Sequence, residues 1–352
     1  MSATTVRNAT QPTLSPDRIL QTGFGFWAAK ALLSATELGV FSELAGGPLE
    51  GHVLASRLGV HRRSAHDFFD SLVALKFLLR DELGRYSNTP ETSQFLDQGK
   101  PSYIGGILEM ANARLFEHWN GLTEALRTGR PQNETKGLEP TERDEHFKTI
   151  YGTPERLKCF LRAMTGISMG TGRVMAEKFA WPKHKTVLDV GTAEGGLPVQ
   201  ILLAHQHLRG VGFDLPEVKP VFDEYVTRMK LSDRLAFVGG DAFKDDLPEA
   251  DVVVLGHMLH GWGAAGKRAL LERAYRALPR GGACIVYDAM IDDDRRDNAF
   301  GLLMSLNMLI ETEEGFDYTP AQCRQWLADA GFREVRTEHL AGPDTMCVGV
   351  KL

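Results

Sequence analysis

Two patterns of hydrophobic and polar positions divide the chain. From residue 186 onward, short apolar runs alternate with stretches whose apolar residues recur at helical spacing. Apolar strands separated by amphipathic helices are typical of a parallel, doubly wound sheet with helices on both faces. The sequence therefore predicts an α/β fold with a Rossmann-like domain over residues 181–352. The runs are TVLDV (186–190), GVGFD (210–214), LAFVGGD (235–241), ADVVVLG (250–256), GACIVYD (282–288) and TMCVGVKL (345–352).

Residues 17–100 show a helical pattern instead, and GRYSNTP (84–90) predicts a small hairpin. Helix, turn, helix and hairpin form a winged-helix pattern, which can read DNA with its second helix. Residues 50–100 hold seven Lys or Arg and seven Asp or Glu, and a neutral surface attracts DNA phosphates poorly. We therefore predict a winged-helix dimerisation domain over 17–100, with a DNA-binding regulator as the alternative outside the enzymes.

The same domain has more large apolar residues than 84 residues could easily cover alone. Contiguous exposed apolar side chains mark interfaces between subunits. We therefore expect a homodimer. The residues concerned are Phe24, Phe26, Trp27, Leu32, Leu33 and Phe41.

The remaining segments carry weaker signals. Residues 1–16 have no apolar core and are expected to form a disordered tail. Residues 101–180 are predicted to be a helical linker that contributes to a ligand pocket. Their helical pattern is broken by a polar segment at 128–145, which predicts an exposed loop.

Composition narrows the classes of partner. The formal net charge of −6 argues against nucleic acid or an anionic membrane as a partner. No stretch approaches 18 uninterrupted apolar residues and no targeting pattern precedes residue 17, so a cytoplasmic protein is expected. The four cysteines are scattered without metal-ligand spacing. We therefore expect no metal centre.

The strand at 186–190 leads into a turn of small residues, GTAEGG (191–196), and then into a helix. Asp214 ends the next strand, 23 residues beyond Gly191, where a carboxylate can reach the ribose of a bound nucleotide. Both dinucleotides and S-adenosylmethionine fit this pattern. Ala193 stands at the second glycine of the dinucleotide fingerprint, and its methyl group would crowd a pyrophosphate, which weakens the NAD interpretation.

Two further carboxylates suit a single nucleotide with a short charged tail. Asp189 ends the first strand, where it could attract an ammonium group. Asp241 ends the third strand, beside the position expected for adenine, where its oxygens could accept from an exocyclic amine.

Six segments, VLDVGTAEGG, GFDLP, GGDAF, HMLHGW, ALPRGG and GFDYT, together resemble the S-adenosylmethionine-dependent O-methyltransferases of the plant caffeate and animal hydroxyindole type, including bacterial members of secondary metabolism. The resemblance covers nearly the whole chain, because that family also carries an N-terminal winged-helix dimerisation domain. It implies a class I methyltransferase domain, S-adenosylmethionine as cofactor, a small-molecule acceptor and a homodimer.

The resemblance also assigns cofactor contacts. The turn at Gly191 would hold the methionine portion, and Asp214 and Leu215 would meet ribose and adenine. Asp241 and Phe243 would surround the adenine. The full set is Asp189, Gly191, Asp214, Leu215, Asp241, Ala242, Phe243, Gly256 and His257.

HMLHGW (257–262) resembles the segment in which a histidine supplies the general base, and here that histidine is His260. Imidazole suits the task because its pKa is near neutrality, so activity is expected to fall below pH 6 to 7. The family braces this histidine with two acidic residues. The matching positions are Asp288 and Asp317, each one carbon shorter than the glutamates commonest there.

Gly261 departs from the family, which usually has aspartate after the base. The absence of this carboxylate suggests either that proton abstraction is less demanding in this protein or that its methyl acceptor differs from that of the family. A thioether sulfur has no proton to lose, and the bacterial methylthiohydroxybutyrate S-methyltransferases of dimethylsulfoniopropionate synthesis resemble this branch. A hydroxyl acceptor is favoured. Thioether, nitrogen and carbon acceptors, and a member that has lost catalysis, stay open.

The acceptor pocket is expected between the helix before the first strand and the helix at 300–311. An amide within an apolar stripe needs a partner, and family members use a matching asparagine on substrate. The candidates are Phe160, Met164, Ser168, Asn307 and Tyr151, with Trp119 as a weaker one.

Overall fold

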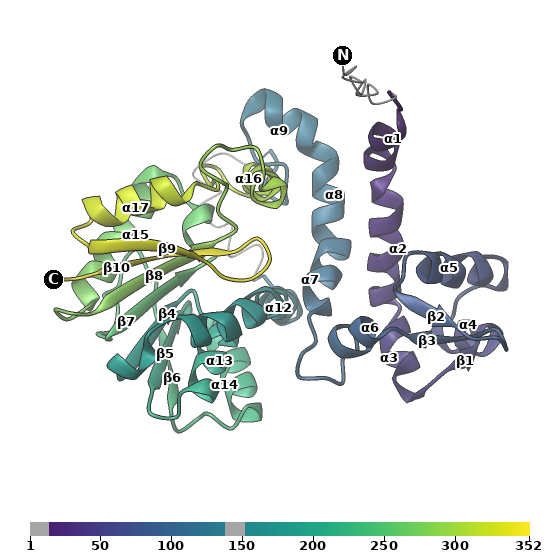
Figure 1. The fold of residues 1–352 in the computed structure, drawn as a ribbon, viewed down its shortest axis with the longest axis horizontal. Helices are drawn as coiled ribbons and strands as arrows, with labels where there is room; N and C mark the ends of the chain where they lie inside the picture. Colours follow the sequence, from purple (N-terminus) through teal and green to yellow (C-terminus); the bar gives the residue numbers. More distant parts are fainter. Residues whose placement is uncertain (1–13, 138–151) are drawn as a thin grey trace, which may run out of the picture. The chain divides into compact units, whose positions relative to one another are not determined.

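The computed structural model describes residues 14–137 and 152–352 (Figure 1). The chain divides into two compact units, residues 1–93 and 94–352, and each is described by itself. Most of the predicted tail at 1–16, together with the candidate Tyr151, lies outside the described residues.

The first unit is a winged helix. Its β2–β3 hairpin confirms the predicted wing, and β1 pairs with β3 to give the strand order β1–β3–β2. Asp81 closes the hairpin turn by accepting hydrogen bonds from the backbone of Leu83 and Arg85. Its elements are α1 (Asp17–Gly23), α2 (Gly25–Glu37), α3 (Val40–Glu43), η1 (Leu44–Gly46), β1 (Leu49–Glu50), α4 (Gly51–Leu58), α5 (Arg62–Ala74), β2 (Leu78–Arg80) and β3 (Arg85–Asn88), before α6 (Pro90–Phe95).

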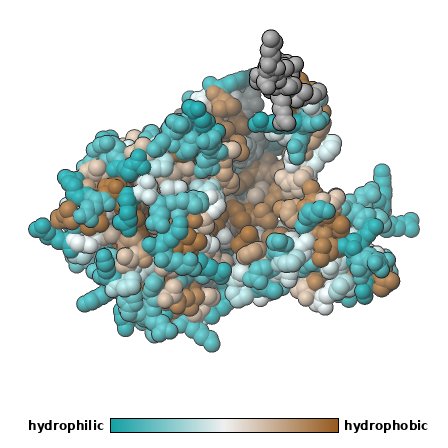
Figure 2. All heavy atoms as spheres, viewed as in Figure 1, coloured by the Kyte–Doolittle hydropathy of each residue, from teal (hydrophilic) through white to brown (hydrophobic). Residues whose placement is uncertain are grey.

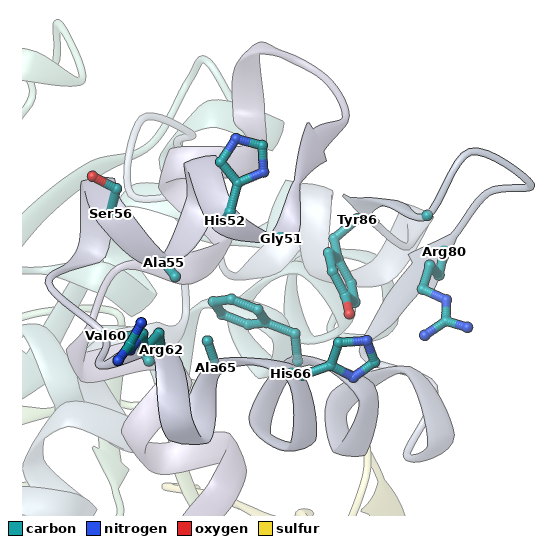
Figure 3. Close-up of a pocket in the computed structure, with 12 residues that line it drawn as sticks. Gly51, His52, Ala55, Ser56, Val60, Arg62, Ala65, His66, Arg80 and Tyr86 are labelled. Carbon is teal, nitrogen blue, oxygen red and sulfur yellow. The ribbon is translucent and has the colours of Figure 1, made fainter.

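A cleft of about 600 Å³ lies in this unit among α4, α5 and the hairpin (Figure 3). Its polar side is organised by Asp70, which accepts hydrogen bonds from Arg80 at 2.6 Å and from the Tyr86 hydroxyl at 2.9 Å. None of the residues expected to bind cofactor or acceptor lines it.

The first unit also exposes apolar residues on α1 and α2. Ile19 is 75% exposed and Trp27 is 62% exposed, and Phe24 and Phe26 are exposed as well. Hydrophobic residues reach the molecular surface among hydrophilic ones (Figure 2). Two residues of the predicted interface, Leu33 and Phe41, are instead buried in the unit's own core, so only part of the expected apolar excess is left uncovered.

The second unit begins with helices. Residues 105–128 form α7 (Gly105–Met110), a π-helical turn η2 (Ala111–Leu115), α8 (Phe116–His118), η3 (Trp119–Gly121) and α9 (Leu122–Thr128). The long helix α12 (Pro154–Lys178) begins at Thr153, whose side chain accepts from the backbone of Arg156, and Pro154 occupies its first turn.

The described part of the polar segment at 128–145 corrects one expectation. Residues 128–130 are exposed as expected, but Gln132, Asn133 and Thr135 are buried. The Gln132 backbone donates to the carbonyl of Ile310 at 2.9 Å, and the Asn133 amide donates to that of Glu311 at 2.7 Å. Gln132 and Asn133 are buried because they satisfy the last carbonyls of helix α16 (Ala299–Glu311), and Thr135 donates to Asn133 Oδ1.

A seven-stranded sheet in the order β6–β5–β4–β7–β8–β10–β9 forms the centre of this unit. The five strands from β6 to β8 pair in parallel, whereas β10 is antiparallel to both neighbours. All six predicted strands are confirmed, but β9 was missed because its sequence, REVRTEH, is polar. The strands are β4 (Thr186–Val190), β5 (Arg209–Asp214), β6 (Leu235–Gly239), β7 (Val252–Gly256), β8 (Ala283–Asp288), β9 (Arg333–His339) and β10 (Thr345–Val350).

Side chains of the central strands alternate between two apolar cores. In β7, Val252 and Val254 join one core, and Val253 and Leu255 join the other. The first core packs under α12, α13 (Gly196–Ala204) and α14 (Lys219–Arg228), and the second under α15 (Ala264–Ala277) and α17 (Pro320–Asp329) (Figure 1). The sheet is therefore covered on both faces, which confirms the doubly wound architecture.

Two smaller findings complete the fold. Within the parts of the chain that the structure describes, no helix is both long and apolar enough to cross a membrane. The four cysteines are free thiols, and three of them are buried.

Candidate active site

The turn between β4 and α13 is built from residues in left-handed backbone conformation. Gly191, Ala193 and Gly195 have φ values of 73°, 52° and 90°. A side chain on Gly195 would approach the Phe222 ring to 2.9 Å, so glycine is required there by packing as well as by conformation. The backbone of Gly191 donates to the carbonyl of Phe213 at 2.8 Å, which holds the turn against the end of β5.

Asp214 lies beside this turn. Its Oδ2 accepts from the backbone of Ala193 and its Oδ1 from that of Leu215, both at 2.8 Å. Burial raises the pKa of Asp214 to about 6, although both backbone hydrogen bonds oppose the rise. Each carboxylate oxygen keeps a lone pair that can accept from a hydroxyl group.

Asp189 is buried at the end of β4. Burial raises its pKa to about 7, a hydrogen bond with Thr192 lowers it, and the charge of Asp214 raises it further. No lysine or arginine of the described residues is among these contributors. A cation brought to this point would therefore stabilise the charged carboxylate.

Asp241 follows β6. It accepts from Lys244 Nζ at 2.9 Å and from the backbone of Phe243 at 2.9 Å. Burial acts to raise the pKa of Asp241, but these two hydrogen bonds outweigh it and hold the pKa below its ordinary value. The Phe243 ring packs edge-on against Trp262, with centroids 4.4 Å apart, and Ala242 is buried in the core.

At the end of β7, Gly256 and His257 adopt constrained positions. A side chain on Gly256 would overlap the Tyr287 ring, because its Cβ would lie 2.0 Å from a ring carbon. His257 has φ of 47°, and its Nδ1 lies 3.6 Å from Asp288 Oδ1 while its Nε2 lies 3.3 Å from Asp344 Oδ2. Burial lowers the pKa of His257, but the two carboxylates outweigh burial and raise it.

His260 stands on the short turn η6 (Leu259–Gly261), between two buried carboxylates. Its Nδ1 lies 3.3 Å from Asp317 Oδ1 and 3.6 Å from Asp288 Oδ1. The structure therefore brings the three predicted catalytic residues together, and the short aspartate side chains reach the ring. Asp317 does not cap the following helix, because Thr319 does so.

The pKa of His260 differs from the sequence-based expectation of 6 to 7. Burial lowers it, but Asp288 and Asp317 outweigh burial and raise the pKa to about 9. The expectation was too low because a motif does not reveal two carboxylates at contact distance. Among the residues that the structure describes, Asp288 Oδ1 and Asp317 Oδ2 have no hydrogen-bond partner, so each can still accept a hydrogen bond.

Three contacts of this cluster carried no recognisable sequence signal. The Tyr318 hydroxyl donates to Asp288 Oδ2. Asp344, between β9 and β10, accepts from the Thr171 hydroxyl at 2.6 Å as well as facing His257. Lys267, on α15, is fully buried close by. Asp344 and Lys267 lie in segments with no motif, and Tyr318 belongs to GFDYT but was not singled out there. Only the fold brings the three together.

The cluster also bears on metal binding. The donor atoms of His257, His260 and Asp288 lie within 4.8 Å of one another. Two ligands of a tetrahedral zinc ion lie about 3.4 Å apart, so the rings would have to move to hold one.

The candidates for acceptor binding lie on α12 and α16. Trp119 Nε1 donates to Asn307 Oδ1 at 2.9 Å, so the amide within the apolar stripe has a partner in the protein. Phe160 and Met164 pack, partly buried, against the first core, and the Ser168 hydroxyl donates to the Met164 carbonyl.

One turn beyond Asn307, Glu311 pairs with Arg114 at 2.6 Å. Arg114 also donates to the two carboxylate oxygens of Glu134 through Nε and Nη2. This ion-pair cluster is anchored on the π-helical turn η2, and sequence reasoning missed it because its three members are far apart in the chain.

Comparison with known proteins identifies the family. A family model described as the O-methyltransferase domain matches residues 119–333, and one described as the O-methyltransferase dimerisation domain matches residues 20–98. The chain belongs to the O-methyltransferase family. It is an S-adenosylmethionine-dependent methyltransferase, as the resemblance implied.

Three relatives illustrate the range of this family. The methyltransferase is 45% identical to the tetracenomycin polyketide synthesis 8-O-methyl transferase of Streptomyces glaucescens, over 96% of this chain and 97% of that one. It is 35% identical to an N,N-dimethyltransferase of Streptomyces rimosus, over 97% and 98%. The crystal structure of human N-acetylserotonin methyltransferase in complex with S-adenosylmethionine superposes with a TM-score of 0.88 at 30% identity, over 97% and 99%.

Proposed function

We propose that the methyltransferase holds S-adenosylmethionine across the carboxyl ends of β4, β5 and β6 and methylates a phenolic hydroxyl whose proton His260 accepts. S-adenosylmethionine supplies the methyl group as an electrophile on its sulfonium sulfur. The protein must then orient the acceptor oxygen and remove its proton.

The cofactor residues fit this role on three observations. Asp189 is a buried carboxylate without a cation, which suits an ammonium group. Asp214 keeps free lone pairs for ribose hydroxyls beside Leu215. Gly191 allows the tight turn, because its φ is 73° and a side chain there would meet Met258 Sδ at 3.0 Å. We assign Asp241 and Phe243 to the adenine side on their position after β6.

The position of His260 between two buried carboxylates, with Nδ1 3.3 Å from Asp317 Oδ1 and 3.6 Å from Asp288 Oδ1, is the observation that carries the acceptor assignment. A phenol resembles tyrosine, whose pKa is about 10, whereas an ordinary imidazole has a pKa of about 6.5. Proton transfer between them would be uphill by about 3.5 pKa units, or roughly 5 kcal/mol. With His260 at about 9, the mismatch falls to about one unit, or roughly 1.4 kcal/mol. The two carboxylates therefore match the base to a phenol.

A nitrogen acceptor is the second candidate, because a relative that matches 97% of this chain at 35% identity is named as an N,N-dimethyltransferase. A thioether acceptor gains nothing from the cluster, because no proton leaves sulfur. The relative at 45% identity, named as an 8-O-methyl transferase, further supports oxygen.

Methyl-transfer assays with labelled S-adenosylmethionine test the proposal. Polycyclic phenols, aromatic amines and thioether acids should be compared as acceptors at equal concentration. We expect the phenols to be turned over most efficiently. Preferred methylation of an amine or a thioether acid would contradict the assignment, and retained cofactor binding without any turnover would indicate a member that has lost catalysis.

Replacing Asp214 with alanine should weaken cofactor binding by about 1.5–3 kcal/mol, because two hydrogen bonds to a charged acceptor are lost. Calorimetric titration with S-adenosylhomocysteine measures the change. Asp223→Ala is the matched control, because Asp223 is an exposed carboxylate paired with Lys219 on α14. Equal affinity of both variants would contradict the assignment of Asp214.

We also propose that two copies associate through the exposed apolar face of α1 and α2. The match to the dimerisation domain supports this. Light scattering should give about twice the chain mass of 38.9 kDa at micromolar concentration. Trp27→Glu should lower the mass to that of one chain, whereas Leu83→Glu should not, because Leu83 is 76% exposed on the hairpin turn instead. A single-chain mass for the unmodified protein would refute the dimer.

A further inference from the structure

Lys267 is a buried cation for which the proposed chemistry has no assigned role. It lies in the first turns of α15, and its side chain is fully buried. A lysine is rarely buried without a specific partner, because removing an ammonium group from water is costly. Among the ion pairs of the described residues, none contains Lys267, so its contacts are with neutral groups.

Those contacts join two segments of the active site. Lys267 Nζ donates to the carbonyl of Trp262 and, at 3.0 Å, to that of Phe316. It also lies 3.6 Å from the centre of the Phe316 ring, a cation–π distance. Trp262 is two residues from His260, and Phe316 precedes Asp317. One ammonium group therefore bridges the backbone beside the base and the backbone beside its carboxylate.

Two glycines let these segments approach each other. A side chain on Gly315 would lie 2.7 Å from the His260 carbonyl oxygen. One on Gly263 would overlap the Glu314 carboxylate, at 2.3 Å. The two segments are thus packed backbone to backbone, and Lys267 lies at the junction.

We propose that Lys267 is a positioning residue that fixes the His260 turn against the Asp317 segment, and that its charge keeps part of His260 unprotonated at neutral pH. This inference rests on the proposed role of His260 as base.

The proposed effect of the Lys267 charge on His260 depends on the other charged groups around the ring. His260 faces Asp288 from β8, Asp317 from the segment after α16, His257 from its own loop and Lys267 from α15, with Asp344 from the β9–β10 turn more distant. Glu314 packs on the far side of the turn at Gly263. The carboxylates stabilise the imidazolium, and Lys267 opposes them. Burial lowers the pKa of Lys267 to about 8, against the pull of Asp288 and Asp317, so the two cations titrate in overlapping ranges.

Lys351 provides a matched control. Its Nζ also donates to two backbone carbonyls, those of Tyr275 and Leu278, and lies 4.7 Å from the centre of the Tyr275 ring. These contacts are at the carboxyl end of α15, away from the cluster at its beginning. Lys351→Met removes the same kind of contacts without removing a charge near His260.

The experiment compares turnover of Lys267→Met, Lys267→Arg and Lys351→Met with the unmodified enzyme from pH 7 to pH 10. We expect Lys267→Met to lose about 10- to 100-fold at pH 7, the range for displaced catalytic groups. Its loss should shrink about three- to tenfold by pH 10, because removing the cation raises the pKa of His260 by about 0.5–1 unit. Lys267→Arg, which stays charged over the whole range, should retain most of the turnover at pH 7. Lys351→Met should match the unmodified enzyme at every pH.

A loss for Lys267→Met that is constant with pH would overturn the electrostatic part, and unchanged turnover would overturn both parts. If this variant does not fold, Lys267→Gln, which retains a donor, must show the same pH trend.

NMR titration of the His260 ring, assigned with His260→Gln, separates the proposed effect of Lys267 from the proposed role of His260 as base. A raised ring pKa in Lys267→Met with full activity in His260→Gln supports the cation's influence and refutes the base. An unmoved ring pKa refutes the influence of Lys267, whatever the base does.

Discussion

Replacing His260 with glutamine should lower turnover of a phenolic acceptor about 100- to 10,000-fold, the usual range for loss of a general base. Glutamine keeps a polar side chain of similar reach but has no site that accepts a proton at neutral pH. Affinity for S-adenosylhomocysteine should stay within a factor of about two, because His260 faces Asp288 and Asp317 and makes no contact with the Gly191 turn among the described residues. Single-turnover rates with labelled cofactor and calorimetry measure the two quantities.

His184→Gln is the control for this substitution. His184 stacks on Phe179 before β4 and has no contact with the carboxylate cluster, so its replacement should leave turnover unchanged. A loss of tenfold or less for His260→Gln would favour an acceptor without a proton, such as a thioether. The base assignment would then be wrong, while the family would stand.

The carboxylates around His260 bear on why residue 261 is a glycine where the family usually has aspartate. A side chain at Gly261 would meet no atom within 4 Å, so packing does not require glycine there. From the sequence, the missing aspartate suggested either a less demanding proton abstraction or a different acceptor. In the structure, Asp288 and Asp317 already raise the pKa of His260 to about 9. A third carboxylate would raise it further and leave less free base at neutral pH.

Much of this site could be predicted because its residues terminate strands. Asp189 and Asp214 follow apolar runs, and the carboxyl ends of parallel strands meet at one edge of the sheet. His260, Asp288 and Asp317 were identified by resemblance, and the fold brings them within 3.6 Å. In each case the position depends on a local pattern that the sequence displays directly.

The parts that were missed depend on contacts between distant segments. The polar strand β9 forms because β10 offers its backbone, which no alternation in REVRTEH reveals. Asn133 is buried because α16 ends beside it. Lys267 occupies an ordinary position in an amphipathic helix, and only the meeting of two loops gives its charge a role. The pKa of His260 belongs to the same class, since it depends on which charges surround the ring.

The activity should rise about 50-fold between pH 7 and pH 9 with a phenol whose own pKa is about 10 or above. The direction follows from the cluster: Asp288 and Asp317 favour the imidazolium, so the ring holds its proton below about 9 and accepts one from the acceptor only when free. Each unit below that pKa lowers the unprotonated fraction about tenfold. The plot of log kcat/KM against pH should therefore have a slope of one up to about pH 9.

Measurements at constant ionic strength with labelled S-adenosylmethionine give this profile, and circular dichroism at each pH confirms that the fold persists. The slope should disappear in His260→Gln, because no group then gains the role of base as the pH rises. A thioether acceptor should give a flat profile even with the unmodified enzyme, since no proton moves. A profile that levels off near pH 7 would show that the two carboxylates do not retain the imidazolium once cofactor and acceptor are bound, and the matching of His260 to a phenol would fail with it.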